Sequence, residues 1–261
     1  MEISLYQIDA FSSKLFEGNP AAVCPLDEWL PDEMMQSIAE ENNLSETAFF
    51  VPKGNGYHIR WFTPASEVDL CGHATLASAY VLFNFLNYKN EAIQFDSKSG
   101  VLVVTRDEDW LVLDFPKQPP VSCDIPKEIV AAFNIKPIKC LKSEDLIVVF
   151  ENEIDIELAN PDFEQLKKLD SRGVIITAKS TRYDFVARFF APKYGIPEDP
   201  VTGSAYTQLA PYWASELGSN KFRVKQMSSR GGELYCEIVG DRVLISGKAT
   251  KYLEGKITIE A

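Results

Sequence analysis

Short runs in which branched and aromatic residues alternate with polar ones recur along the chain, and this two-residue period predicts β-strands. The clearest runs cover residues 3–11, 48–52, 57–62, 101–106 and 110–115. Residues 31–42 have a helical period instead, begin with Pro31, and predict an amphipathic surface helix. Residues 73–86 leave almost no polar face, so we expect a helix there that is surrounded by protein.

The same order of features occurs twice. Residues 57–64 and 185–192 share the pattern aromatic-x-x-Arg-aromatic-Phe-x-Pro. Each of these strands precedes a loop with acidic residues and then a glycine that opens an alanine-rich helix. The matched landmarks are Pro31-Asp32 and Pro161-Asp162, Glu67 with Asp69 and Glu198 with Asp199, and Gly72 and Gly203. The alternative to a duplication is that both halves merely share a common strand–loop–helix arrangement. Four landmarks in the same order favour an internal duplication.

The duplication predicts an α+β protein with two pseudo-equivalent lobes. We expect an N-terminal lobe of residues 1–118 and a C-terminal lobe of residues 119–261. Pro116, Pro119 and Pro120 mark the connector between them. A chain of 261 residues is long enough to bury two cores of ordinary size.

Charge and cysteine content narrow the functional classes. The formal net charge is −12 and the basic residues are scattered, so we expect neither nucleic acid nor a membrane as a partner. The five cysteines are far apart in the sequence and form no C-x-x-C pair, which is typical of cytoplasmic thiols. The start of the sequence alternates like a strand, so we expect no signal peptide, and no apolar run reaches membrane-spanning length. These features favour a cytoplasmic protein that acts on a small molecule.

Three positions are candidates for chemistry. Gly72 and Gly203 each open a predicted helix, where backbone N–H groups and the helix dipole favour an anion such as a carboxylate. Glu46 lies between a predicted helix end and an apolar strand, so we expect partial removal of its carboxylate from water, which suits acid/base work. Helix capping and a solvated turn are the purely structural interpretations of these positions. Because nucleotide loops and metal-binding spacings are lacking, we expect neither a cofactor nor a metal.

Four motifs in this order resemble the PhzF-like family of phenazine-biosynthesis-type isomerases, and the resemblance covers essentially the whole chain. The motifs are Gly18-Asn19-Pro20-Ala21-Ala22-Val23, Leu44-Ser45-Glu46-Thr47, Cys71-Gly72-His73-Ala74-Thr75-Leu76-Ala77 and Asp199-Pro200-Val201-Thr202-Gly203-Ser204-Ala205. The resemblance implies a diaminopimelate-epimerase-like fold. In that fold each lobe is a strongly curved, mostly antiparallel sheet around a central helix.

The resemblance also implies a set of site residues in a cleft between the lobes. The catalytic group comprises the general acid/base Glu46 and three residues that line the pocket and assist the transfer, His73, Asp199 and Ser204. The substrate-binding positions are Asn19, Gly72 and Gly203. Since the start of a helix lowers the pKa of an imidazole, we expect His73 to be a neutral hydrogen-bonding partner. The other histidine, His58, matches no catalytic position.

The function implied by the resemblance is a cofactor-independent isomerase that acts on a small carboxylated molecule. Glu46 would carry the proton in a suprafacial double-bond shift. One alternative is an amino-acid epimerase or racemase that uses Cys71, although Thr202 stands where the related epimerases have their second cysteine and a hydroxyl is a much weaker base than a thiolate. Another is a non-catalytic paralogue that binds a small acid. The family resemblance also allows a homodimer.

Overall fold

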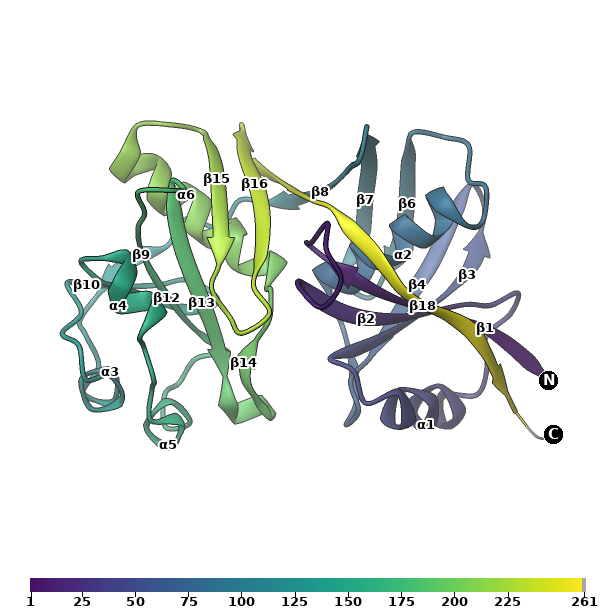
Figure 1. Ribbon diagram of the computed structural model, residues 1–261, viewed down its shortest axis with the longest axis horizontal. Coiled ribbons are helices and arrows are strands. Elements are labelled where there is room, and N and C mark those ends of the chain that lie inside the picture. Colours follow the sequence, from purple (N-terminus) through teal and green to yellow (C-terminus); the bar gives the residue numbers. More distant parts are fainter. Residues whose placement is uncertain (260–261) are drawn as a thin grey trace. The chain divides into compact units, whose positions relative to one another are not determined.

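The computed structural model describes residues 1–259, which form two compact units. The first unit contains residues 1–114 together with the chain from Ser246 onward, and the second contains Phe115–Ile245. The expected division into 1–118 and 119–261 therefore requires a correction at its C-terminal end. The last strand, β18 (Ala249–Thr258), pairs antiparallel with β1 (Glu2–Ala10), so the chain returns to the first unit (Figure 1).

The first unit is built on a mixed sheet with the strand order β18–β1–β2–β3–β4–β6–β7–β8. Neighbouring strands are antiparallel except for the parallel pairs β2–β3 and β4–β6, and the short β5 pairs with β4. The remaining strands are β2 (Asn19–Pro25), β3 (Glu46–Lys53), β4 (Gly56–Phe62), β5 (Glu67–Val68), β6 (Ala92–Ser97), β7 (Gly100–Asp107) and β8 (Trp110–Pro116).

Each parallel pair of strands in the first unit requires a crossover, and each crossover contains a helix. The helix α1 (Asp32–Asn42) connects β2 to β3 and buries Met35 and Ile38 in a core cluster, as expected for an amphipathic surface helix. The helix α2 (Gly72–Asn84) lies between β5 and β6 in the chain and contacts β1, β2 and β3. Its residues Leu76 and Val81 have no exposed surface, which confirms the prediction of a helix surrounded by protein.

The second unit repeats this topology. Its strands run in the order β9–β10–β11–β12–β13–β15–β16, β14 pairs with β13, and the parallel pairs β11–β12 and β13–β15 correspond to β2–β3 and β4–β6. The predicted duplication is therefore confirmed. The strands are β9 (Val121–Cys123), β10 (Lys139–Lys142), β11 (Leu146–Val149), β12 (Val174–Lys179), β13 (Phe185–Ala191), β14 (Ile196–Asp199), β15 (Lys221–Gln226), β16 (Gly232–Val239) and β17 (Arg242–Gly247).

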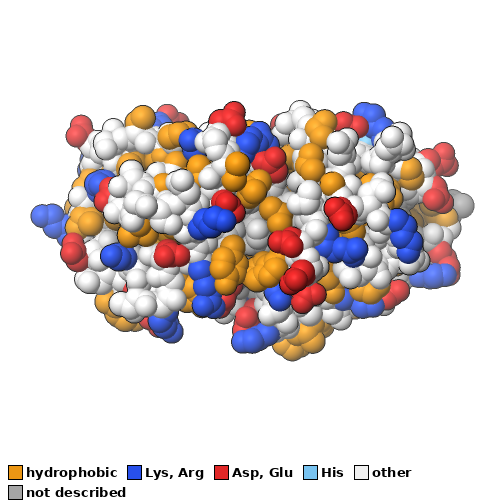
Figure 2. All heavy atoms as spheres, turned by 90° about the horizontal axis from the view of Figure 1, so that it is seen from above, with side chains coloured by type: hydrophobic (Ala, Val, Ile, Leu, Met, Phe, Trp, Pro, Cys, Tyr) orange, Lys and Arg blue, Asp and Glu red, His pale blue; other side chains and the backbone are white. Residues whose placement is uncertain are grey.

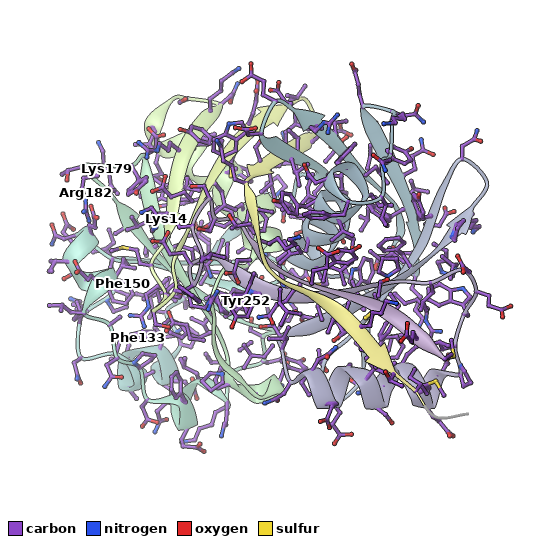
Figure 3. The ribbon with its side chains drawn as sticks, turned by 45° about the vertical axis from the view of Figure 1, so that its right-hand side comes forward. Lys14, Phe133, Phe150, Lys179, Arg182 and Tyr252 are labelled. Carbon is purple, nitrogen blue, oxygen red and sulfur yellow. The ribbon has the colours of Figure 1, made fainter. Side chains whose placement is uncertain are left out.

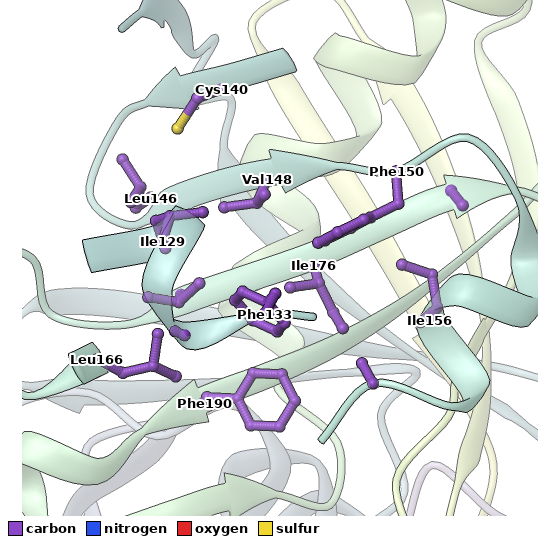
Figure 4. Close-up of a cluster of buried hydrophobic side chains, with 14 of the residues drawn as sticks. Ile129, Phe133, Cys140, Leu146, Val148, Phe150, Ile156, Leu166, Ile176 and Phe190 are labelled. Atoms are coloured by element: carbon purple, nitrogen blue, oxygen red, sulfur yellow. The ribbon is translucent and has the colours of Figure 1, made fainter. Parts of the chain in front are cut away.

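Helices of the second unit cover the sheet and close its core. They are α3 (Lys127–Ala132), α4 (Glu153–Glu157), α5 (Phe163–Leu166) and α6 (Tyr206–Leu217), with the short 3-10 helices η1 (Pro192–Tyr194) and η2 (Gly203–Ala205). Phe133, Phe150 and Phe190 meet in the buried cluster between α3, α5 and the sheet (Figure 4). The η2–α6 pair occupies the position in the chain that α2 has in the first unit.

The surface agrees with the charge pattern of the sequence. On the face that Figure 2 shows, acidic and basic side chains are interspersed rather than gathered by sign. No helix within residues 1–259 combines the length and the apolar composition that a membrane span requires.

An arginine–glutamate pair recurs in the two units. The guanidinium of Arg60 donates to both carboxylate oxygens of Glu67 at 2.7 and 2.9 Å, and Arg188 donates to both oxygens of Glu198 at 2.6 and 3.0 Å. Each guanidinium also lies 5.1 Å from the ring of the phenylalanine two positions later. The repeated sequence pattern therefore preserves an anchor that ties the short strands β5 and β14 to the strand before each of them.

The Arg188 anchor should be worth more than a surface ion pair. The Arg188 side chain is only 13% exposed, and its guanidinium also donates to the carbonyl oxygens of Ile156 and Ala159. We expect Arg188→Met to lower the free energy of unfolding by about 2 kcal/mol, because it leaves Glu198 partly buried without its partner. Equilibrium denaturation in urea measures this change.

A matched control is Arg182→Met. The Arg182 side chain is 70% exposed, lies at the surface in Figure 3 and pairs with Glu153. Its loss should cost less than about 1 kcal/mol. Equal costs for the two substitutions would show that the Arg188 pair is no anchor.

Candidate active site

Asn19 is held at the start of β2 by the glycine before it. Gly18 has a φ of +72°, and a Cβ there would lie 2.2 Å from the carbonyl oxygen of Ala10, so only glycine fits. The turn brings Asn19 into the interior, where it has no exposed surface. Its amide nitrogen lies 3.2 Å from Nδ1 of His73.

Glu46 is the first residue of β3 and stands beside Ala21 of the parallel strand β2. The helix before it ends with Asn43 in the left-handed conformation, and Asn42 donates to the hydroxyl of Thr47 at 3.1 Å. These contacts fix the chain on both sides of Glu46. Its side chain is 12% exposed, so the expected partial removal from water is confirmed.

His73 is the second residue of α2 and is 5% exposed. Its Nε2 lies 3.0 Å from Oε2 of Glu46, and its Nδ1 lies 3.5 Å from the sulfur of Cys71. Within residues 1–259 neither Nε2 nor Oε2 makes a hydrogen bond of regular geometry, and the contact with Glu46 becomes an ion pair when His73 is protonated. The imidazole ring therefore stands between the carboxylate on one side and the amide and thiol groups on the other.

The pKa of His73 is shifted in the direction opposite to the expected one. Burial lowers the pKa of its imidazole, but interactions with Cys71 and Glu46 outweigh burial and place the pKa well above its ordinary value. Burial raises the pKa of the Cys71 thiol to about 11, so Cys71 is uncharged at neutral pH and the Glu46 carboxylate is the neighbour that favours a charged imidazole. An imidazolium donates from both nitrogens, so in that state the Asn19 amide, whose nitrogen lies at Nδ1 in this structure, would have to turn over and present its oxygen.

The same three side chains include the donor types that zinc prefers. One donor atom each of Glu46, Cys71 and His73 lie within 4.8 Å of one another. However, Glu46 faces Nε2 while Cys71 faces Nδ1, so an ion bound to one ring nitrogen would reach both other donors only after a rearrangement. The expectation of a metal-independent site stays a prediction.

In the second unit, Asp199 ends β14 and orders the loop that follows. Its carboxylate accepts a hydrogen bond from the hydroxyl of Thr202. Gln226 completes the arrangement, since its side chain accepts from the backbone N–H of Thr202 at 2.9 Å and donates to the carbonyl of Asp199 at 3.0 Å. The loop therefore enters the η2 helix at Gly203 in a fixed conformation.

Ser204 contacts residues that the sequence did not single out. Its hydroxyl oxygen accepts from Nη2 of Arg172 at 3.3 Å. Arg172 is held by Asp145, which has no exposed surface and accepts from Nε and Nη2 at 2.9 and 2.6 Å. Gln208 donates to the same carboxylate at 2.7 Å. Because Arg172 donates to Ser204, the serine hydroxyl keeps its own hydrogen for another acceptor.

The strand register shows that the second unit has no counterpart of Glu46. Thr47 pairs with the phenylalanine that ends the repeated pattern in β4, and Val174 pairs with the equivalent phenylalanine in β13. The residue before Val174 is Gly173, which thus occupies the position of Glu46. A Cβ at Gly173 would lie 2.3 Å from the ring of Phe189, so the space for a side chain is filled.

The predicted site residues accordingly fall into two groups. Glu46 and His73 are in contact in the first unit. Asn19 contacts the His73 ring, and Gly72 directly precedes His73 in the sequence. The second unit holds the other predicted residues, Asp199, Gly203 and Ser204.

Known proteins resemble this chain over its full length. An uncharacterised isomerase of Pseudomonas aeruginosa is 51% identical over 257 residues, which cover 98% of this chain and 99% of that protein. The crystal structure of a PhzF-family phenazine biosynthesis protein from Enterococcus faecalis matches 99% of this chain and 100% of its own, with a TM-score of 0.97 and 46% identity. An epimerase predicted in Pseudomonas aeruginosa has the same fold, with a TM-score of 0.78 at 19% identity over 99% of this chain and 100% of its own.

The duplicated fold and these relatives define the protein as an isomerase with an epimerase-like fold. The sequence model of the phenazine biosynthesis-like proteins matches residues 8–255. The chain belongs to that family, the PhzC/PhzF family, as its motifs predict.

The ion pair makes a prediction about His73. In Glu46→Gln the carboxylate is lost while the burial remains, so the pKa of His73 should fall. NMR titration of the imidazole protons measures it, with His58, whose pKa burial lowers, as the internal reference. An unchanged pKa of His73 would mean that Glu46 does not determine its charge.

The same pair predicts how stability depends on pH. Since the pKa of His73 is raised in the folded protein, its contribution is fully present below the unfolded-state pKa of about 6.5 and is lost as pH rises through the folded-state value. Denaturation at a series of pH values should show this decline in the parent protein and a weaker one in Glu46→Gln.

Proposed function

We propose that the protein is a cofactor-independent isomerase in which Glu46 carries a proton between two carbons of a small carboxylated substrate. The observation that supports this most is the asymmetry of the two units. A carboxylate stands beside His73 in the first unit, whereas Gly173 stands at the equivalent position in the second. A single proton carrier favours chemistry on one face of the substrate.

The proposed reaction is a suprafacial double-bond shift. Glu46 removes a proton from an activated carbon, the electron pair of that C–H bond moves into the conjugated system, and the protonated Glu46 returns the proton to another carbon on the same face. No electron is gained or lost, so no redox partner takes part. A positioned carboxylate of this kind contributes a factor on the order of a hundred or more to the rate.

His73 would balance the charge of Glu46 during this transfer. A buried carboxylate is costly unless a cation or hydrogen-bond donors compensate it, and a protonated His73 would be the cation, 3.0 Å away. Asn19 would fix the plane of the imidazole through Nδ1. Both residues thus position the acid/base.

The substrate class rests on the helix starts at Gly72 and Gly203, whose backbone N–H groups suit a carboxylate. Asp199 and Ser204 would assist through the loop and the hydroxyl described above. The homodimer and the cytoplasmic location suggested by the sequence stay predictions.

Racemisation with two thiols is the weaker candidate. Cys71 stands directly before the glycine that opens α2, but Thr202 stands before the corresponding glycine in the second unit. Burial raises the pKa of Cys71 to about 11, so little thiolate is present at neutral pH. A mechanism in which the Glu46 carboxylate carries the proton needs neither a second thiol nor a thiolate at Cys71.

The first functional prediction concerns Glu46. A thermal-shift screen of small carboxylates identifies a ligand, and NMR in deuterated buffer then follows incorporation of solvent deuterium into it. Glu46→Gln should keep the fold and slow this exchange by a factor on the order of a hundred or more. The exposed Glu41→Gln on α1 is the matched control and should exchange at the parental rate. Binding without exchange in the parent protein would instead favour the small-acid-binding paralogue.

A second prediction separates the two enzymatic mechanisms. Cys71→Ala should keep the turnover rate within about tenfold, because only packing is disturbed. Cys24→Ala removes another buried thiol and gives the size of a pure packing effect. Complete loss of turnover in folded Cys71→Ala, together with deuterium and racemisation at one α-carbon, would establish the epimerase mechanism.

A further inference from the structure

Two of the cysteines lie directly opposite each other in the second unit, although 16 residues separate them in the sequence. The strands β9 and β10 are antiparallel, and their register places Cys123 beside Cys140. Residues paired in this way have Cα atoms about 4.5 or 5.5 Å apart and side chains on the same face of the sheet. Both separations fall within the range of roughly 4.4–6.8 Å that disulfides span.

The two thiols differ in their surroundings. Cys140 is 2% exposed and lies at the edge of the core cluster, near Leu146 (Figure 4). Cys123 is only partly buried and packs against the same cluster. Burial and then a hydrogen bond with the Cys123 thiol raise the pKa of Cys140 to about 12. The strand register places the two side chains beside each other, and Cys123 is the sulfur that a small reagent reaches first.

The other cysteines are placed differently. Cys24 is fully buried and stands beside Phe49 across its strand pair, and Cys236 stands beside Phe222. Cys71 precedes α2 in the first unit. Their surroundings favour inert thiols, whereas the pair on β9 and β10 has a resolving sulfur within reach.

We propose that Cys123 and Cys140 are a thiol-oxidation site that a peroxide converts into an intramolecular disulfide. The Cys123 thiolate attacks one peroxide oxygen, the O–O bond breaks, and Cys123 becomes a sulfenic acid while water or an alcohol leaves. Cys140 then attacks the Cys123 sulfur, the S–S bond forms and water leaves. In sum, two thiols lose two electrons and two protons, and the peroxide O–O bond takes them up.

The bond would tie the first strand of the second unit to β10 and close a loop that contains α3. A cross-link of this kind restricts the unfolded chain more than the folded one. The oxidised protein should therefore melt at least about 4 °C higher than the reduced protein.

The test uses the full chain, reduced and then treated with hydrogen peroxide. Remaining thiols are alkylated in denaturant, and the digest is analysed by mass spectrometry without reduction. We expect one cross-linked peptide pair that contains Cys123 and Cys140. Of the five cysteines in the chain, the three others should be alkylated, and the melting temperature should be higher. Dithiothreitol should reverse both changes.

Cys123→Ser and Cys140→Ser should each lose the cross-link and the rise in melting temperature. If Cys140→Ser does not fold, Cys123→Ser is a sufficient test, because Cys123 is only partly buried. Cys236→Ala is the matched control that keeps both effects. The proposal fails if peroxide takes Cys123 to sulfinic or sulfonic acid while Cys140 stays a thiol, or if the cross-link joins two chains.

Discussion

The fold depends on one interaction that occurs in both units, the two-point hydrogen bonding of a strand arginine to a glutamate in the short strand that follows. Arg60 and Arg188 hold Glu67 and Glu198 in this way, and in each unit the glycine that opens a helix follows five residues after the glutamate. A planar guanidinium fixes both the distance and the orientation of its partner. The helix starts, and the side chains that they carry, inherit their positions from these anchors.

Identical anchors hold different chemistry. In the first unit the anchored loop delivers His73 to the carboxylate of Glu46, in an arrangement nearly closed to water. In the second it delivers Ser204 to a guanidinium that the buried Asp145 already neutralises. The arginine–glutamate pair and the strand order around it are the same in both units, whereas the charges and the hydrogen bonds of the side chains at the helix starts differ. A duplicated fold can thus hold two unlike sets of functional groups with equal accuracy.

Much of this was predictable from the sequence because it depends on local patterns. The repeated strand pattern revealed the duplication, and the apolar run after Gly72 revealed the buried helix. The return of β18 to the first unit was not predictable, since it depends on pairing with a strand some 250 residues earlier in the chain. The direction of the pKa shift of His73 was missed because it arises from neighbours in space, and Asp145 was missed because an acid that follows Glu144 and precedes an apolar strand looks like an ordinary turn residue.

The ring of Phe189 has a consequence for how such a protein can evolve. It fills the space beside Gly173, where a carboxylate equivalent to Glu46 would stand. Restoring an acid there would require the ring to shrink or move at the same time, and either change made alone would create a clash or a cavity. The functional difference between the two units is therefore hard to reverse in evolution, because no single substitution restores a carboxylate at both equivalent positions.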